Sequence, residues 1–211
     1  MYNPAIHKRR SIRLNNYDYS GEGLYFITLC VADRKNVFGE ILNGEMHLNA
    51  FGDIAAEEWA KSPEIRKNIS LGNFIIMPNH MHGIISIDFA IDSKAKEYIG
   101  KFHSPTQTIG AIIRGYKGAT TKRINNLIRQ IKEDYRSTGE LQFAPTVNPS
   151  NIKRNAPADN LSIIQQNSLT GEGSIWQRDY YEHIIRTDIA YQNISNYILN
   201  NPSKWERDKL K

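Results

Sequence analysis

The chain has 211 residues, a formal net charge of +5, 40% hydrophobic residues and a single cysteine. These values are typical of one globular domain that is large enough to bury a core, and no run approaches the ~18 apolar residues that a membrane-spanning helix needs. The one cysteine, Cys30, excludes an internal disulfide and a cysteine-rich zinc site. The basic N-terminus has no apolar segment of the signal-peptide type behind it, so we expect a cytoplasmic protein without a membrane partner.

The N-terminal part of the chain predicts an arm followed by strands. Residues 1–23 are basic and end in a turn signal, so we expect an arm there and a single domain over residues 24–211. The continuous apolar run of residues 24–31 predicts a strand that is covered on both faces. Asn43-Gly44, between two short strand-like segments, predicts a β-hairpin.

The middle of the chain alternates between helical and strand patterns. Residues 49–66 carry a partly apolar helical face. Residues 71–77 and 80–87 are apolar and joined by a tight turn, so they predict two strands that pair antiparallel. From residue 104 to about residue 132, isoleucines recur at spacings of three and four, which predicts a long amphipathic helix.

The C-terminal third begins with a change of character. Residues 133–173 are polar and lack a sustained period, so we expect a long loop or disordered insertion. Residues 174–186 end in the alternation of a strand, and Thr187 or Asp188 can cap a last helix. That helix should end just before Pro202, because the residue preceding a proline is pushed away from α geometry. This order of elements predicts an α+β fold with helices packed on an antiparallel sheet.

Two histidines follow the turn between the central strands. Because side chains alternate faces along a strand, His80 and His82 should lie side by side on one face. Two neutral imidazoles held in this way form half of a metal site. The alternative is that they are two half-exposed histidines with no ligand.

Basic residues gather in two places. Residues 101–136 hold eight lysines and arginines against two acidic residues, and a second cluster lies near the N-terminus. Such clusters favour a polyanion through phosphate contacts and counterion release, although a solvated helix face gives the same pattern. The candidate DNA-contacting residues are Arg9, Arg10, Arg13, Arg114, Lys117, Lys122 and Arg123.

Three segments form a pattern known from other proteins: the His-x-His motif in an apolar strand, the segment WQRDYYEHIIR, and a helix reading NYILNNP. Together they resemble the HUH single-tyrosine transposases, and within these the REP-associated tyrosine transposases. The opening RRSIRLNNYDYSGEGLYFITLCVADRKNVFGEI is also similar, so the resemblance covers most of the chain except residues 133–173. It implies a ferredoxin-like or RRM-like antiparallel sheet, the HUH palm.

The resemblance also implies an activity. It is the cleavage and rejoining of single-stranded or hairpin DNA, such as palindromic repeat ends, through a 5′-phosphotyrosine. By resemblance, His80 and His82 match the paired metal ligands and Tyr197 matches the nucleophile. The cofactor would be a divalent ion, Mg²⁺ or Mn²⁺, and imidazole ligands suit Mn²⁺ better.

A third ligand is less well matched. Related transposases commonly carry a glutamine four residues after the tyrosine, and here that position holds Asn201, which is one methylene shorter. Tyr197 and Asn201 would still share a helix face at this spacing. Glu182 and His183 on the neighbouring strand are possible substitutes.

Each assignment has a structural alternative. Tyr197 stands beside Ile194 and Ile198 and fits a core aromatic, Asn201 fits a helix-ending residue, and His183 fits a core histidine. At the level of function, a non-catalytic nucleic-acid-binding protein that retains the fold is one alternative. A metal-dependent hydrolase of small phosphates is another, but it explains neither the basic clusters nor the tyrosine. A monomer and a homodimer both fit the sequence.

Overall fold

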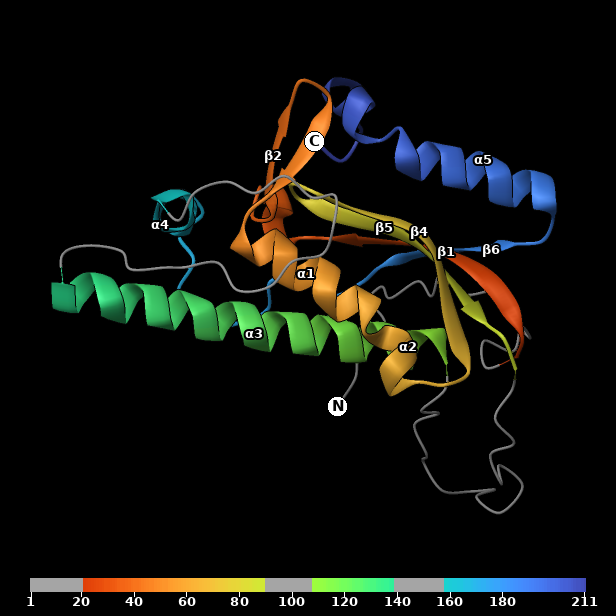
Figure 1. The fold of residues 1–211 in the computed structure, drawn as a ribbon, viewed down its shortest axis with the longest axis horizontal. Helices are drawn as coiled ribbons and strands as arrows, with labels where there is room; N and C mark the ends of the chain where they lie inside the picture. The colour runs from red at the N-terminus through yellow and green to blue at the C-terminus, as the bar shows by residue number, and fades with distance from the viewer. Residues whose placement is uncertain (1–20, 90–107, 139–157) are drawn as a thin grey trace, which may run out of the picture.

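The structure, a computed structural model, describes residues 21–89, 108–138 and 158–211. Its centre is a four-stranded antiparallel sheet with the strand order β4-β5-β1-β6 (Figure 1). The strands are β1 (Gly23–Cys30), β4 (Ile69–Met77), β5 (His80–Ile87) and β6 (Tyr181–Ile185). With its packed helices this sheet confirms the predicted α+β class. The predicted N-terminal arm, with Arg9, Arg10 and Arg13, lies outside the described residues.

Helices cover both faces of this sheet. The helices α1 (Ala50–Ala60) and α3 (Ile109–Thr138) lie on one face, and α5 (Asp188–Leu199) lies on the other (Figure 1). Residues of β1 alternate between them: Ile27 belongs to the large core with α1 and α3, while Phe26 packs with Ile198 of α5. The strand is thus buried on both faces, as its continuous apolar run predicted. Among the described residues, no helix is long and apolar enough to cross a membrane.

The predicted hairpin forms a small sheet of its own. Strands β2 (Gly39–Leu42) and β3 (Glu45–Leu48) pair antiparallel around Asn43 and Gly44, whose φ angles are 54° and 78°. Positive φ at both central residues is the geometry that Asn-Gly favours in two-residue hairpins. Asn49 then starts α1, because its side chain accepts hydrogen bonds from the main-chain N–H groups of residues 51 and 52.

The helix predicted over residues 49–66 is broken into two. It ends at Ala60, and a short α2 (Ser62–Ile65) follows with Pro63 in its first turn. A proline further inside one continuous helix would remove a main-chain hydrogen bond and collide with the preceding turn. The break after Ala60 places Pro63 where its missing N–H costs nothing.

The expected insertion at residues 133–173 is partly helical. Helix α3 continues six residues past Lys132, to Thr138, and its three glycines do not interrupt it. Within the same stretch, α4 (Ala158–Gln166) packs Ile164, which is 2% exposed, against the main core. The Lys132 ammonium donates to the main-chain oxygen of Leu169 at 2.7 Å, which ties the segment after α4 to α3. Residues 139–157 lie outside the described part of the chain.

The last helix begins and ends where the sequence predicted. Its end, however, does not come from the steric effect of Pro202 on the preceding residue. Thr187 caps α5 by accepting a hydrogen bond from the N–H of Ala190 at 3.1 Å. The helix breaks at Asn200 (φ −93°, ψ 4°), whereas Asn201, directly before the proline, keeps α geometry (φ −61°, ψ −44°). The expected steric effect of Pro202 on its predecessor is therefore wrong here. A 3₁₀ segment, η3 (Pro202–Arg207), turns the chain back over the sheet.

The close approach of α1 to β5 gives a stability prediction. A Cβ atom on Gly83 would lie 2.8 Å from Cζ2 of Trp59, whose indole is fully buried. We expect Gly83→Ala to lower the free energy of unfolding by ~1–3 kcal/mol through overpacking. Urea unfolding followed by tryptophan fluorescence measures the change.

The matched control is Gly118→Ala in α3. Among the described residues, an added Cβ there would meet no atom outside its own helix within 4 Å, so the variant should gain ~0.5–1 kcal/mol from helix propensity. Equal effects of the two substitutions would contradict the packing of β5 against Trp59.

Candidate functional site

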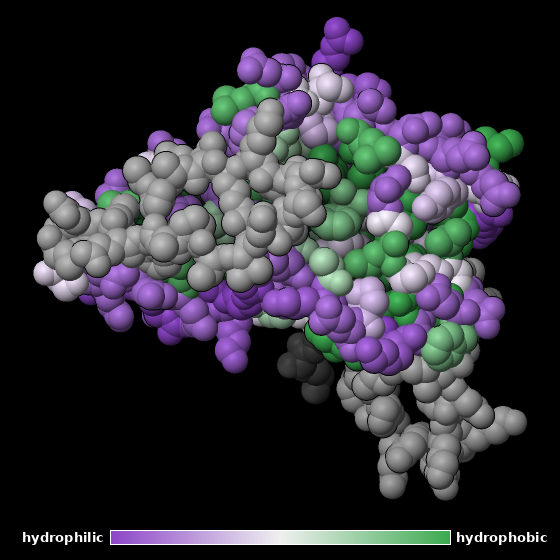
Figure 2. All heavy atoms as spheres, in the orientation of Figure 1, coloured by the Kyte–Doolittle hydropathy of each residue, from purple (hydrophilic) through white to green (hydrophobic). Residues whose placement is uncertain are grey.

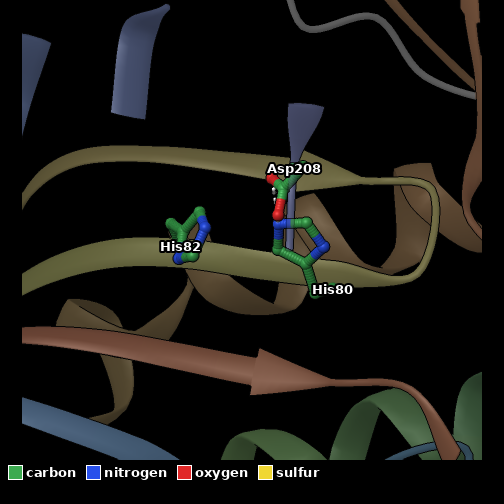
Figure 3. A group of neighbouring side chains, drawn as sticks. All are labelled: His80, His82 and Asp208. Atoms are coloured by element: carbon green, nitrogen blue, oxygen red, sulfur yellow. Dashed lines mark ion pairs between the residues drawn. The ribbon is translucent and has the colours of Figure 1, made fainter. Parts of the chain in front are cut away.

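Two buried imidazoles lie next to each other on the face of the sheet that α5 covers. His80 and His82 are 0% and 2% exposed, and their ring centroids are 4.7 Å apart. Both side chains project from β5 toward the same side (Figure 3), as strand periodicity predicts. Antiparallel pairing sets Cys30 opposite His80 and Thr28 opposite His82. The pair is thus built into the middle of the sheet.

Both ring nitrogens of His82 have hydrogen-bonding partners. Nδ1 lies 2.8 Å from Oγ1 of Thr28, and Nε2 lies 3.1 Å from the hydroxyl oxygen of Tyr197. The Phe26 ring stacks on the imidazole with a centroid distance of 5.3 Å. These three contacts fix the position and tilt of the ring.

Among the described residues, only one ring nitrogen of His80 has a hydrogen-bond partner. Its Nδ1 donates to Oδ1 of Asn79 at 2.7 Å, and the Asn79 amide donates in turn to the main-chain oxygens of Leu210 (2.7 Å) and Arg34 (3.3 Å). Because carbonyl oxygens can only accept, these bonds set the orientation of the amide and give His80 the Nδ1–H tautomer. Its buried Nε2 keeps a lone pair, which has no hydrogen-bond partner within the described ranges.

A carboxylate completes a possible metal site. The Oδ2 atom of Asp208 lies 3.8 Å from Nε2 of His80 (Figure 3), and the ligand atoms of His80, His82 and Asp208 all lie within 4.8 Å of one another. Two imidazoles and a carboxylate form a donor set that divalent transition metals accept. The unsatisfied Nε2 of His80 fits such an ion. A buried polar atom has lost its hydrogen bonds to water, and a bound ion would replace them. These three residues can therefore bind a divalent metal.

Electrostatics keeps both imidazoles neutral, which is the form that binds metals. Burial lowers the pKa of His80 to about 4, although the negative charge of Asp208 opposes this. Burial, followed by the neighbouring His80, lowers the pKa of His82 to about 3. At neutral pH neither ring therefore carries a proton on both nitrogens.

Tyr197 reaches this pair from the last turn of α5. Its side chain is 42% exposed, so it is no core aromatic, and its ring lies 6.1 Å from Phe26 in an edge contact. Burial and the charge of Asp208 raise the pKa of the phenol above its usual value of 10, while a hydrogen bond from Asn201 lowers it. Since the pKa of His82 is about 3, this imidazole is a poor base for the phenol proton.

Asn201 lies one helical turn after Tyr197 and is 2% exposed. Its Oδ1 atom has no hydrogen-bond partner among the residues that the structure describes, an arrangement that typically costs about 1–3 kcal/mol. The side chain nevertheless lies close enough to Tyr197 to lower the pKa of its phenol. The amide thus lies at the site, and its oxygen is available to a ligand.

The two substitutes on β6 lie apart from this group. Glu182 is paired with Ile27, so it projects toward the face that α3 covers, away from His80. His183 is paired with Phe26 on the site's face, but it is exposed and β1 separates it from β5. Among the described residues, the carboxylate that lies beside His80 belongs to Asp208 instead. Sequence reasoning missed Asp208, since nothing in its local sequence marks it and only the turn of η3 brings it to His80.

The candidate DNA-contacting residues on α3 lie across the sheet from Tyr197 (Figure 1). Arg123 bonds the carboxylates of Glu57 and Glu58 at 2.7 and 2.6 Å. The Lys117 ammonium donates to three main-chain oxygens of residues 177–179, and burial lowers its pKa to about 8. Lys122 and Arg114 are exposed on α3, and the surface along this helix is hydrophilic (Figure 2).

Comparisons with known proteins give a sequence relative and several similar solved structures. No family model matches the chain. A Haemophilus influenzae protein, described as uncharacterized, is 36% identical over 209 residues, which cover 99% of this chain and 96% of that protein. The structure of a REP-associated tyrosine transposase bound to a REP hairpin has a TM-score of 0.48 at 15% identity and covers 94% of this chain and 77% of that one.

A candidate transposase from Deinococcus radiodurans R1 has a TM-score of 0.39 at 14% identity, with 90% of this chain and 97% of that one covered. Because neither TM-score reaches 0.5, the case for function rests on the geometry of the site.

The low pKa of His82 predicts how stability depends on pH. The unfolded chain binds a proton at His82 below pH ~6.5, whereas the folded protein binds it only near pH 3. The stabilisation is therefore complete above pH 6.5 and is lost as the pH falls toward 3. We expect His82→Gln to reduce the slope of unfolding free energy between pH 4 and 6 by about 1.4 kcal/mol per pH unit. Urea unfolding across this range measures the slope, and an unchanged slope would contradict the burial of a neutral His82.

Proposed function

We propose that this chain, which belongs to the same family as the Haemophilus influenzae protein, is a metal-dependent single-stranded DNA transposase. It would cleave and rejoin hairpin or palindromic repeat ends through a 5′-phosphotyrosine intermediate. The observation that supports this best is the 3.1 Å contact between the Tyr197 hydroxyl and His82, beside the donor set of His80, His82 and Asp208. An accessible phenol beside a metal-binding pair supplies the two components that such a reaction needs.

The proposed roles follow from the contacts. His80, His82 and Asp208 would hold a divalent ion, Mn²⁺ or Mg²⁺, and Asn201 would supply a further oxygen. When bound, the ion polarises the scissile phosphate and offsets the charge that develops during transfer. Asn79 holds His80 in the tautomer that leaves Nε2 available.

Tyr197 is the proposed nucleophile. Its oxygen attacks phosphorus, the bond from phosphorus to the 3′ oxygen breaks, and the phenol proton passes through solvent to the departing oxygen. The products are a 5′-phosphotyrosine and a free 3′-hydroxyl, and a 3′-hydroxyl of another strand end restores the phosphodiester by the reverse attack. The exposed position of Tyr197 allows a DNA strand to reach it.

DNA would be held by aromatic and basic side chains. Tyr181 is 54% exposed on the site's face, in edge contact with Phe26 at 6.4 Å, and offers a ring on which an unpaired base can stack. Arg114 and Lys122, on the far face, would hold DNA away from the cleaved bond, as would Arg9, Arg10 and Arg13 of the N-terminal arm. Arg123 and Lys117 also lie on α3, and the side chains of both bind protein groups.

The nucleophile is tested with Tyr197→Phe. Incubated with hairpin oligonucleotides and Mn²⁺, the wild-type protein should form a covalent adduct that survives denaturing electrophoresis, and Tyr197→Phe should form none because it lacks the attacking oxygen. Tyr135→Phe, an exposed tyrosine on α3 across the sheet, is the control and should form the adduct as the wild type does.

An adduct in Tyr197→Phe would show that the nucleophile is a different residue. A wild-type protein that binds the hairpin but forms no adduct with either Mg²⁺ or Mn²⁺ would favour the alternative, a non-catalytic nucleic-acid-binding protein.

The third ligand is tested with Asp208→Asn. This substitution keeps the shape of the side chain but removes the carboxylate charge, so the dissociation constant for Mn²⁺ should rise at least ~10-fold. Glu206→Gln removes one charge from η3, which ends directly before Asp208, at an exposed position and should leave the constant unchanged. Calorimetric titration of the DNA-free protein measures both, and equal effects would contradict a ligand role for Asp208.

A further inference from the structure

His82 has no free position for an ion. A neutral imidazole has one N–H group and one lone pair, and in this structure Thr28 occupies Nδ1 while Tyr197 occupies Nε2. An ion that binds His82 needs a ring nitrogen with its lone pair exposed. Whichever nitrogen it uses, one of the two hydroxyl groups must give way.

The surroundings decide which hydroxyl group leaves. Thr28 is 7% exposed, lies in the middle of β1 and is the register partner of His82, so its side chain is enclosed and has no route to solvent. Tyr197 is 42% exposed, belongs to the last turn of α5 and extends to His82 from above the sheet. A rotation of the tyrosine side chain toward solvent is enough to break its contact.

We infer that the hydroxyl of Tyr197 and the divalent ion compete for Nε2 of His82, so that the nucleophile is held back until metal binding releases it. This inference rests on the metal site of the proposed function. Thr28 keeps its bond to Nδ1 throughout and is a positioning residue, in the role that the outer partner of a metal-binding histidine usually fills. Binding of the ion to Nε2 of His82 and release of the Tyr197 hydroxyl from that nitrogen then occur in one step.

The exchange links the resting state of the protein to its chemistry. Without the ion, the phenol hydroxyl is hydrogen-bonded to Nε2 of His82 at 3.1 Å. A DNA strand that arrives before the ion therefore meets a Tyr197 hydroxyl that is bound to the imidazole of His82. The protein attacks DNA only when the ion that assists the transfer is already in the site.

The test is the affinity of the DNA-free protein for Mn²⁺, measured by electron paramagnetic resonance of the free ion. Loss of the competing hydroxyl in Tyr197→Phe should tighten binding ~2- to 10-fold, the range of one net hydrogen bond. Tyr181→Phe, whose ring also contacts Phe26, is the control and should leave the affinity unchanged. Thr28→Val should weaken binding by ~10-fold or more, because the outer partner of His82 is lost.

A second measurement needs no metal. The ¹⁵N chemical shift of His82 Nε2 in the metal-free protein should change in Tyr197→Phe and stay the same in Tyr181→Phe. Unchanged or weaker Mn²⁺ binding by Tyr197→Phe, or a reversed order of the Tyr197 and Thr28 variants, would overturn the inference. If the wild type forms the covalent adduct while Tyr197→Phe binds Mn²⁺ no more tightly, the inference fails and the proposed function stands. If the wild type binds no Mn²⁺, both fail.

Discussion

The register between β1 and β5 is the constraint on which the site depends. It places Thr28 opposite His82 and Cys30 opposite His80, so that the residues of β1 which face α5 surround the two imidazoles. A shift of one residue would turn every side chain of one strand to the other face. The bond from Thr28 and the stacking of Phe26 would then both be lost. The pairing of two strands thus determines the geometry of a side-chain site.

The C-terminal segment supplies the remaining side chains and main-chain groups around the two imidazoles. Trp205 stacks on His80 at 6.1 Å, Asp208 supplies the carboxylate, and the main-chain oxygen of Leu210 accepts from Asn79, the residue that orients His80. The imidazoles are buried because this segment lies over them, and burial is what keeps their pKa values low. The final residues of the chain are therefore part of the site rather than an appendage.

Local signals in the sequence predicted most of the fold. Asn43-Gly44 indicated its hairpin because two positive φ angles are tolerated there, and Thr187 indicated the start of α5 through its cap. The period of a strand was enough to place His80 and His82 on one face. Each of these depends on residues that are neighbours in the chain.

The features that the sequence did not predict depend on residues that are distant in the chain. Asp208 meets His80 only through the turn of η3, and Glu182 and His183 could be sorted only once their partners on β1 were known. The short apolar signal of α4 was hidden among polar residues because Ile164 has a partner only after the chain has folded back onto the core. The positive charges of α3 were visible, but their position across the sheet from Tyr197 was not.

The most direct test of this account is to identify the amino acid that becomes attached to DNA. The wild-type protein, Mn²⁺ and a hairpin oligonucleotide are incubated, the DNA is trimmed with nuclease, and peptide mass spectrometry locates the nucleotide that remains. The account predicts a 5′-phosphate linked to the tyrosine oxygen of the peptide that contains NYILNNP, at Tyr197. A nucleotide attached to another residue would contradict it, as would DNA cleavage that leaves no protein-linked nucleotide.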